Sequence, residues 1–177
     1  MQSEKESDHL RHASVIKRSE STSTINLRTA RETVYTITEA DEFDRSFLRL
    51  SPSIAGITSM DADHLDIYGS AEELESSFVE FAALLPESGV LFYQESLGTH
   101  FKHLKCVKHS YGIERGEIRA QNVRIEEGAF VFDFVWNTKT LKGLRMGLAG
   151  IHNIENATLA IAMAIEAGVD PDKLPGA

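Results

Sequence analysis

The stretch that decides the fold is residues 54–68, Ile-Ala-Gly-Ile-Thr-Ser-Met-Asp-Ala-Asp-His-Leu-Asp-Ile-Tyr. Its apolar beginning, 54–57, lies between Pro52 and a polar cluster, which is the pattern of a buried strand. Four acidic or imidazole side chains follow within six positions, namely Asp61, Asp63, His64 and Asp66. Because open α/β sheets bind ligands beyond the carboxyl ends of their strands, the stretch predicts a strand that ends in a binding site.

The chemistry of these side chains leaves two interpretations open. Oxygen ligands with one imidazole and no thiolate suit Mg²⁺ or Mn²⁺ and argue against a structural zinc site. The alternative is a solvated, Asp-rich loop in which one Asp caps a helix.

Length and composition restrict the class of protein. A chain of 177 residues with 42% hydrophobic content fits one globular domain. The net charge of −9 disfavours a nucleic-acid partner. No apolar run approaches the roughly 20 residues that span a bilayer, so we expect no membrane partner. The single cysteine, Cys106, excludes an internal disulfide and suits a reducing cytoplasm, so we expect a cytoplasmic protein.

Residues 1–33 differ from the rest of the chain. They are rich in Ser, Thr and charges of both signs, and their short apolar runs do not extend into a sustained period. Such a segment buries too little apolar surface to offset the entropy lost on ordering it. We therefore expect residues 1–33 to be a disordered or unrelated leader, and the folded domain to cover 34–170.

The next part of the chain predicts parallel strands with a helix between them. Residues 34–38 are β-branched and aromatic and lead into the acidic run 39–44, so that two predicted strands both end in carboxylates. Residues 70–85 predict a helix with a capping box at its start and one apolar stripe. Residues 90–93 complete a β-α-β unit, for which parallel pairing is expected.

Short strands and turns follow this unit. Strands are expected at 107–111, 118–125, 129–136 and 141–148, with turns around Gly116, at Glu127-Gly128 and at 137–139. This spacing predicts an antiparallel meander. The predicted fold class is therefore α/β, with a mostly parallel sheet, flanking helices and a small antiparallel sheet.

A last long helix is expected from Gly150 to Gly168. Asn153 is the predicted N-cap, and Asn156 lies three residues further along the same side. One interpretation is that both amides serve only the start of the helix, with His152 on the surface. The other is that amide side chains at an exposed helix start hydrogen-bond a purine edge.

Together these motifs resemble the central, ATP-binding domain of the Mur ligases. The likeness rests on four linked stretches in family order and covers about residues 36–168. The stretches are Glu39-Ala40-Asp41-Glu42-Phe43-Asp44, 58–68 with Asp63-His64-Leu65-Asp66, Ser110-Tyr111-Gly112, and Gly150-Ile151-His152-Asn153-Ile154-Glu155-Asn156-Ala157. They are most similar to the branch of the family that adds L-alanine to UDP-N-acetylmuramate in peptidoglycan synthesis.

The resemblance implies roles for five residues. Glu39 would bind the Mg²⁺ that bridges the β- and γ-phosphates of ATP, and His64 would bind a second metal ion, Mg²⁺ or Mn²⁺. His152, Asn153 and Asn156 would line the nucleotide pocket, with Asn156 near the adenine. The implied chemistry is ATP-driven amide formation through an acyl phosphate, which the amine of L-alanine then attacks, while the metal ions neutralise charge on the phosphoryl oxygens.

Parts of the family pattern are not matched in this sequence. The Gly-Thr-His-Gly-Lys-Thr phosphate loop, expected before Glu39, is missing, as are the domains on either side of the central one. We therefore expect an incomplete P-loop NTPase-like domain that is inactive alone, with 171–177 as the start of a further domain. An incomplete sheet would leave an edge or a gap and allow self-association.

Two other hypotheses stay open at this point. A murein tripeptide ligase or a folylpolyglutamate synthase shares the superfamily, although the run 39–47 favours the alanine enzyme. A non-catalytic paralogue that acts as a binding module belongs to a different class of protein. A complete gene with a phosphate loop just upstream would favour a fragment, whereas an intact short reading frame would favour the paralogue.

Metal binding tests the two implied metal ligands. Two protein ligands without phosphate oxygens make a weak site, because Mg²⁺ keeps several waters and relies on substrate phosphates. We expect weak Mn²⁺ binding that is lost in His64→Ala, weakened in Glu39→Ala and unchanged in Asn156→Ala, as measured by titration of water-proton relaxation. Equal Mn²⁺ affinity of His64→Ala and the parent chain would exclude His64 as a ligand.

Overall fold

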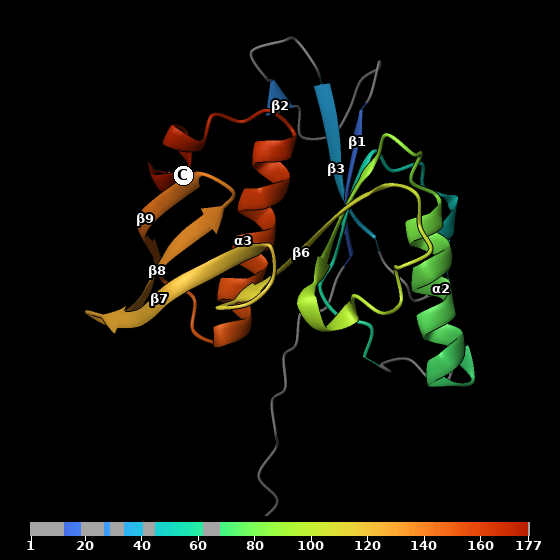
Figure 1. Cartoon of the computed structure of the whole chain (residues 1–177), viewed down its shortest axis with the longest axis horizontal. Helices are drawn as coiled ribbons and strands as arrows, with labels where there is room; N and C mark the ends of the chain where they lie inside the picture. The colour runs from blue at the N-terminus through green and yellow to red at the C-terminus, as the bar shows by residue number, and fades with distance from the viewer. Residues whose placement is uncertain (1–12, 19–26, 29–33, 41–44, 62–67, 177) are drawn as a thin grey trace, which may run out of the picture.

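A mixed sheet of nine strands forms the centre of the computed structural model, which describes residues 13–18, 27–28, 34–40, 45–61 and 68–176 (Figure 1). The strand order is β2-β3-β1-β4-β5-β6-β7-β8-β9. The strands are β1 (Ala13–Arg18), β2 (Leu27–Arg28), β3 (Val34–Ala40), β4 (Ile54–Ile57), β5 (Val90–Gln94), β6 (Val107–Ile113), β7 (Ile118–Glu126), β8 (Ala129–Trp136) and β9 (Lys139–Met146). The helices are α2 (Ala71–Ala83) and α3 (Ile151–Glu166), and the 3₁₀ helices are η1 (Ser46–Arg49), η2 (Glu95–Leu97) and η3 (Pro171–Gly176).

The strands β4, β5 and β6 are parallel, and the pairing of β4 with β5 is the part of the sheet that the sequence predicted best. Helix α2 connects β4 to β5, as the predicted β-α-β unit requires. It begins as predicted, because the Ser70 hydroxyl accepts a hydrogen bond from the Glu73 N–H at 3.2 Å. Its apolar stripe is buried: Leu74, Phe78 and Phe81. The predicted α/β class with flanking helices is confirmed.

The arrangement of β1, β3 and β4 corrects two predictions. Part of the expected leader forms β1, which lies between β3 and β4 and is antiparallel to both. Consequently β3 and β4 are not neighbours, and the described sheet has no gap between them. The sequence of β1 holds only Val15-Ile16 as an apolar pair, but pairing on both sides satisfies its backbone groups without a long apolar period.

The region 107–148 is antiparallel only in part. Strands β7, β8 and β9 pair antiparallel, and Glu127 and Gly128 have φ angles of 52° and 80°, which confirms the predicted turn. Strand β6, in contrast, pairs parallel with both β5 and β7, so the predicted meander begins one strand later than expected. Parallel pairing across the short loop after β6 is assisted by Gly116, whose φ is 85°.

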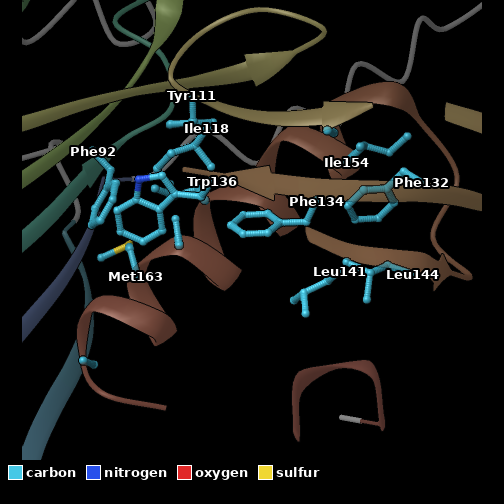
Figure 2. Close-up of a cluster of buried hydrophobic side chains, with 14 of the residues drawn as sticks. Phe92, Tyr111, Ile118, Phe132, Phe134, Trp136, Leu141, Leu144, Ile154 and Met163 are labelled. Atoms are coloured by element: carbon cyan, nitrogen blue, oxygen red, sulfur yellow. The ribbon is translucent and has the colours of Figure 1, made fainter. Parts of the chain in front are cut away.

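Helices α2 and α3 cover opposite faces of the sheet (Figure 1). On the α3 face, Phe132, Phe134 and Trp136 of β8 lie in a row beside Ile154 and Met163 of the helix (Figure 2). Trp136 stands edge-on to Phe92 of β5, with ring centroids 5.7 Å apart. Within the described part of the chain, neither helix has the length and apolar content needed to cross a membrane.

Gly56 of β4 sets how closely α3 approaches the sheet. A Cβ at this position would lie 2.9 Å from both methyl carbons of Leu159 and 3.0 Å from the sulfur of Met163. Such distances are shorter than van der Waals contact, so a side chain at 56 would force the ends of Leu159 and Met163 to move out of the contact between α3 and β4.

We expect Gly56→Ala to lower the free energy of unfolding by about 1–3 kcal/mol, because the added methyl group overpacks the contact with Leu159 and Met163. Urea denaturation measures the effect. Gly147→Ala is the matched control, since a Cβ there meets nothing within 4 Å. Equal stability of the two variants would contradict the close approach of α3.

Candidate active site

A cavity of about 460 Å³ opens at the carboxyl ends of β4 and β5. Its walls come from the segment after β4, the segment after β5, and one helix on each face of the sheet. The lining residues are Thr58, Ser59, Met60, Asp61, Glu75, Gln94, Ser96, Leu97, His100, His152, Glu155 and Asn156. This is the edge where parallel α/β sheets bind their ligands, so the prediction that β4 leads into a site agrees with the cavity.

The start of α3 supplies one wall of the cavity. Its N-cap is Gly150, with φ of 106°, and not Asn153 as predicted. The Asn153 amide instead donates a hydrogen bond to the carbonyl oxygen of Ala149 at 2.6 Å. A Cβ on Gly150 would lie 2.5 Å from the imidazole of His152, so the glycine is what lets that ring fold against the main chain.

Of the three residues predicted to contact the nucleotide, two line the cavity. His152 and Asn156 lie on its wall, whereas Asn153 is not among the described lining residues and is engaged with Ala149. The pattern Asn-x-x-Asn predicts both amides on one side of the start of the helix. Because Gly150 is the N-cap, α3 begins before the predicted N-cap, and Asn153 already lies within its first turn.

Gln94 and Glu155 are site residues that the sequence analysis did not identify. The Gln94 amide donates to the Glu155 carboxylate at 3.3 Å and so ties the end of β5 to the first turns of α3. The side-chain oxygen of Gln94, Oε1, accepts a hydrogen bond from the Ser96 N–H at 2.8 Å, which caps η2. The available signal was that Gln94 ends a buried parallel strand, where site residues are expected.

The charge of the cavity wall is negative. Asp61, Glu75 and Glu155 are carboxylates, and none of the described lining residues is Lys or Arg. The Glu75 carboxylate lies 3.8 Å from the His100 imidazole, and the Ser59 hydroxyl donates to Asp61 at 2.6 Å. Because these groups repel a polyanion, phosphates near this wall require a compensating cation.

Tyr111 of β6 lies buried near Glu155 of this wall. Its hydroxyl donates to the carbonyl oxygen of Ile57 at 3.5 Å, and the ring is fully buried. Burial, together with the nearby Glu155 carboxylate, raises the pKa of Tyr111 far above its usual value. The phenol therefore stays neutral and serves as a packed hydrogen-bond donor between β6 and β4.

Only one of the two predicted metal ligands, Glu39, lies among the residues that the structure describes. Glu39 is exposed near the end of β3 and does not line the cavity. Ser14 of β1 pairs with both Glu39 and Gly56, which places Glu39 on the α3 face, two strand spacings or about 10 Å from β4. His64 lies outside the described residues. Among the residues that are described, no three His, Cys, Asp or Glu side chains group as a metal site.

The fold and the cavity define an α/β protein with an open cavity at the carboxyl edge of its sheet, where such proteins bind their ligands. The Mur ligase middle domain family matches residues 11–164, so the chain belongs to this family. The resemblance inferred from the sequence is confirmed. The match begins inside the segment for which no relationship was expected.

Two relatives show which branch of the family the chain resembles. The chain is 54% identical over 133 residues to the UDP-N-acetylmuramate–L-alanine ligase of Christiangramia forsetii and 45% identical over 139 residues to that of Flavobacterium johnsoniae. These alignments cover 75% and 78% of the chain but 28% and 30% of the relatives. The chain thus spans less than a third of the length of the ligases it matches.

Solved structures support the fold. MurF from Acinetobacter baumannii superposes with a TM-score of 0.64 at 22% identity, covering 76% of this chain and 30% of that one. The UDP-N-acetylmuramate-alanine ligase MurC from Thermotoga maritima gives a TM-score of 0.59 at 21% identity, covering 81% and 33%.

Because the two asparagines of α3 have different surroundings, we expect their replacement by Ala to have different effects on nucleotide affinity and on stability. Asn156→Ala removes an amide from the cavity wall, so we expect nucleotide affinity to fall about fivefold, the value of one hydrogen bond, with little change in stability. Asn153→Ala removes the bond to Ala149, so we expect a Tm lower by roughly 2–4 °C and a smaller effect on affinity. Calorimetric titration and thermal unfolding of both variants would show this, and the reverse assignment of effects would reject the described start of α3.

Proposed function

We propose that the chain is the nucleotide-binding part of an ATP-dependent ligase that adds L-alanine to UDP-N-acetylmuramate in peptidoglycan synthesis. The observation that carries the proposal is the 54% identity over 133 residues with a ligase of that name. The cavity at the carboxyl edge of the sheet supports it, because this is where such a domain would hold its nucleotide.

The cavity fits a nucleoside in size and chemistry. Its volume of about 460 Å³ lies within the range of roughly 300–1,000 Å³ that is typical of small-molecule sites. Asn156 offers an amide group that can both donate and accept, which matches the mixed edge of a purine. The imidazole of His152, at the exposed start of α3, offers a flat surface for stacking.

A divalent cation is the natural complement of the negative wall. Mg²⁺ or Mn²⁺ would neutralise the phosphates of ATP near Asp61 and Glu75. We propose Glu39 and His64 as ligands of such ions. The described residues do not by themselves complete a metal site, so we assign no coordination geometry to it.

We do not expect the chain alone to form the amide bond, because it spans less than a third of the relatives that carry that activity. Purified chain should show no release of phosphate from ATP that depends on UDP-N-acetylmuramate and L-alanine.

Because ATP is a cytoplasmic nucleotide, the proposal also places the protein in the cytoplasm.

Replacement of a segment in a related ligase tests the proposed function. We suggest exchanging the matched 133-residue segment of the Christiangramia forsetii ligase for the aligned part of this chain. The chimera should release phosphate from ATP in the presence of UDP-N-acetylmuramate and L-alanine. The same chimera with Asn156→Ala is the matched control, and its KM for ATP should rise about fivefold.

Two results would contradict the proposal. One is a folded chimera that binds ATP but shows no turnover with L-alanine. The other is a chimera whose turnover is unaffected by Asn156→Ala, since the nucleotide would then not occupy the cavity beside α3.

A further inference from the structure

The cavity wall that follows β5 is held in place at two points. Phe101 is 1% exposed and packs against Tyr93, with ring centroids 5.5 Å apart. Lys108 of β6 provides the second point, since it reaches the turn 101–104. His100 lines the cavity and directly precedes this turn, so its position depends on how the turn is held.

The ammonium group of Lys108 is surrounded by main-chain carbonyl oxygens. Its Nζ donates to the carbonyl oxygens of Leu104 at 2.7 Å, Phe101 at 3.2 Å and Lys102 at 3.4 Å. An ammonium has three N–H donors, so these three bonds account for all of them. None of the acceptors is a carboxylate, and the attraction is therefore between a charge and peptide dipoles.

Three converging carbonyl oxygens are also what a monovalent cation binds. In channel filters, rings of main-chain carbonyl oxygens replace the hydration shell of K⁺. Here the turn is closed by the Leu104 N–H, which donates to the Phe101 carbonyl oxygen at 3.2 Å and keeps the carbonyls of one turn together. Carbonyl groups at the end of a helical turn attract a positive charge.

We propose that Lys108 is a positioning residue whose ammonium takes the place of a bound monovalent cation. It holds the turn 101–104 on β6 and thereby fixes His100 on the cavity wall. The role of Lys108 in holding the turn does not depend on the proposed function. Only the expected change in nucleotide affinity rests on the proposed function.

The first test compares salts at equal ionic strength. Lys108→Met keeps most of the aliphatic stem and removes the charge, so we expect its Tm to fall by roughly 4–8 °C in LiCl or tetramethylammonium chloride. KCl or NH₄Cl should recover most of this loss, because those ions fit between the carbonyl oxygens. If Lys108→Met does not fold, Lys108→Gln replaces it in every measurement. The amide of this variant has two N–H donors for the carbonyl oxygens.

A matched control comes from the same segment. Lys105 is 81% exposed and lies 3.3 Å from the Glu87 carboxylate at the surface. Lys105→Met should change the Tm little and show no difference between the four salts, because an exposed ion pair contributes little to stability.

The single cysteine reports on the turn itself. Cys106 is 7% exposed and lies two residues from Lys108. In Lys108→Met the thiol should react with an alkylating reagent several-fold faster in LiCl than in KCl. The parent chain should show the same rate in both salts.

The effect on His100 is measured by NMR. The imidazole signal, assigned by its loss in His100→Gln, should shift in Lys108→Met in LiCl and return in KCl, and ATP affinity should change in parallel. Loss of stability that is equal in all four salts would overturn the proposal, as would cation rescue that leaves the His100 signal unchanged. Rescue of both the turn and His100, with ATP affinity indifferent to either, would support the proposal and instead contradict nucleotide binding in this cavity.

Discussion

The contact between α3 and Gly56 of β4 is the constraint on which the site depends. Because position 56 has no side chain, Leu159 and Met163 lie directly on the strand. This contact sets how closely α3 approaches β4. His152 and Asn156 lie in the first turns of the same helix and line the cavity at the end of the strand. A residue without a side chain, in the middle of the sheet, therefore helps to hold the helix that forms one wall of the site.

The two walls of the cavity belong to different hydrophobic cores. Helix α3 packs with the core on one face of the sheet, whereas Phe101 and α2 pack with the core on the other face. The sheet lies between these cores, and bonds at the cavity edge join the walls that they support. The hydrogen bond from Gln94 to Glu155 is such a bond. A ligand that contacts both walls would add to this link between the two faces of the sheet.

The sequence predicted the elements whose signals are local. Helix α2, strands β4 and β5, and the Glu127-Gly128 turn follow from apolar periodicity, a capping serine and turn residues within a few positions of each other. Pairing between distant strands has no such local signal, and for this reason β1 was assigned to a disordered leader and β6 to a meander. The candidate site was predicted in part for the same reason. The motif identified His152 and Asn156, while the link from Gln94 to Glu155 joins residues 61 positions apart.

The negative wall of the cavity restricts how an anionic ligand can lie in it. Three carboxylates line the cavity without a described Lys or Arg among them, although Lys108 lies under the same wall. The ammonium group of Lys108 donates to three main-chain carbonyl oxygens of the turn 101–104 and faces that turn. It therefore holds the turn in place but does not attract an anion into the cavity. Such a wall disfavours phosphates next to Glu155 unless a cation lies between them. If the proposed nucleotide occupies this cavity, its uncharged purine is therefore the part expected beside Asn156, and its phosphates are expected to lie away from Glu155.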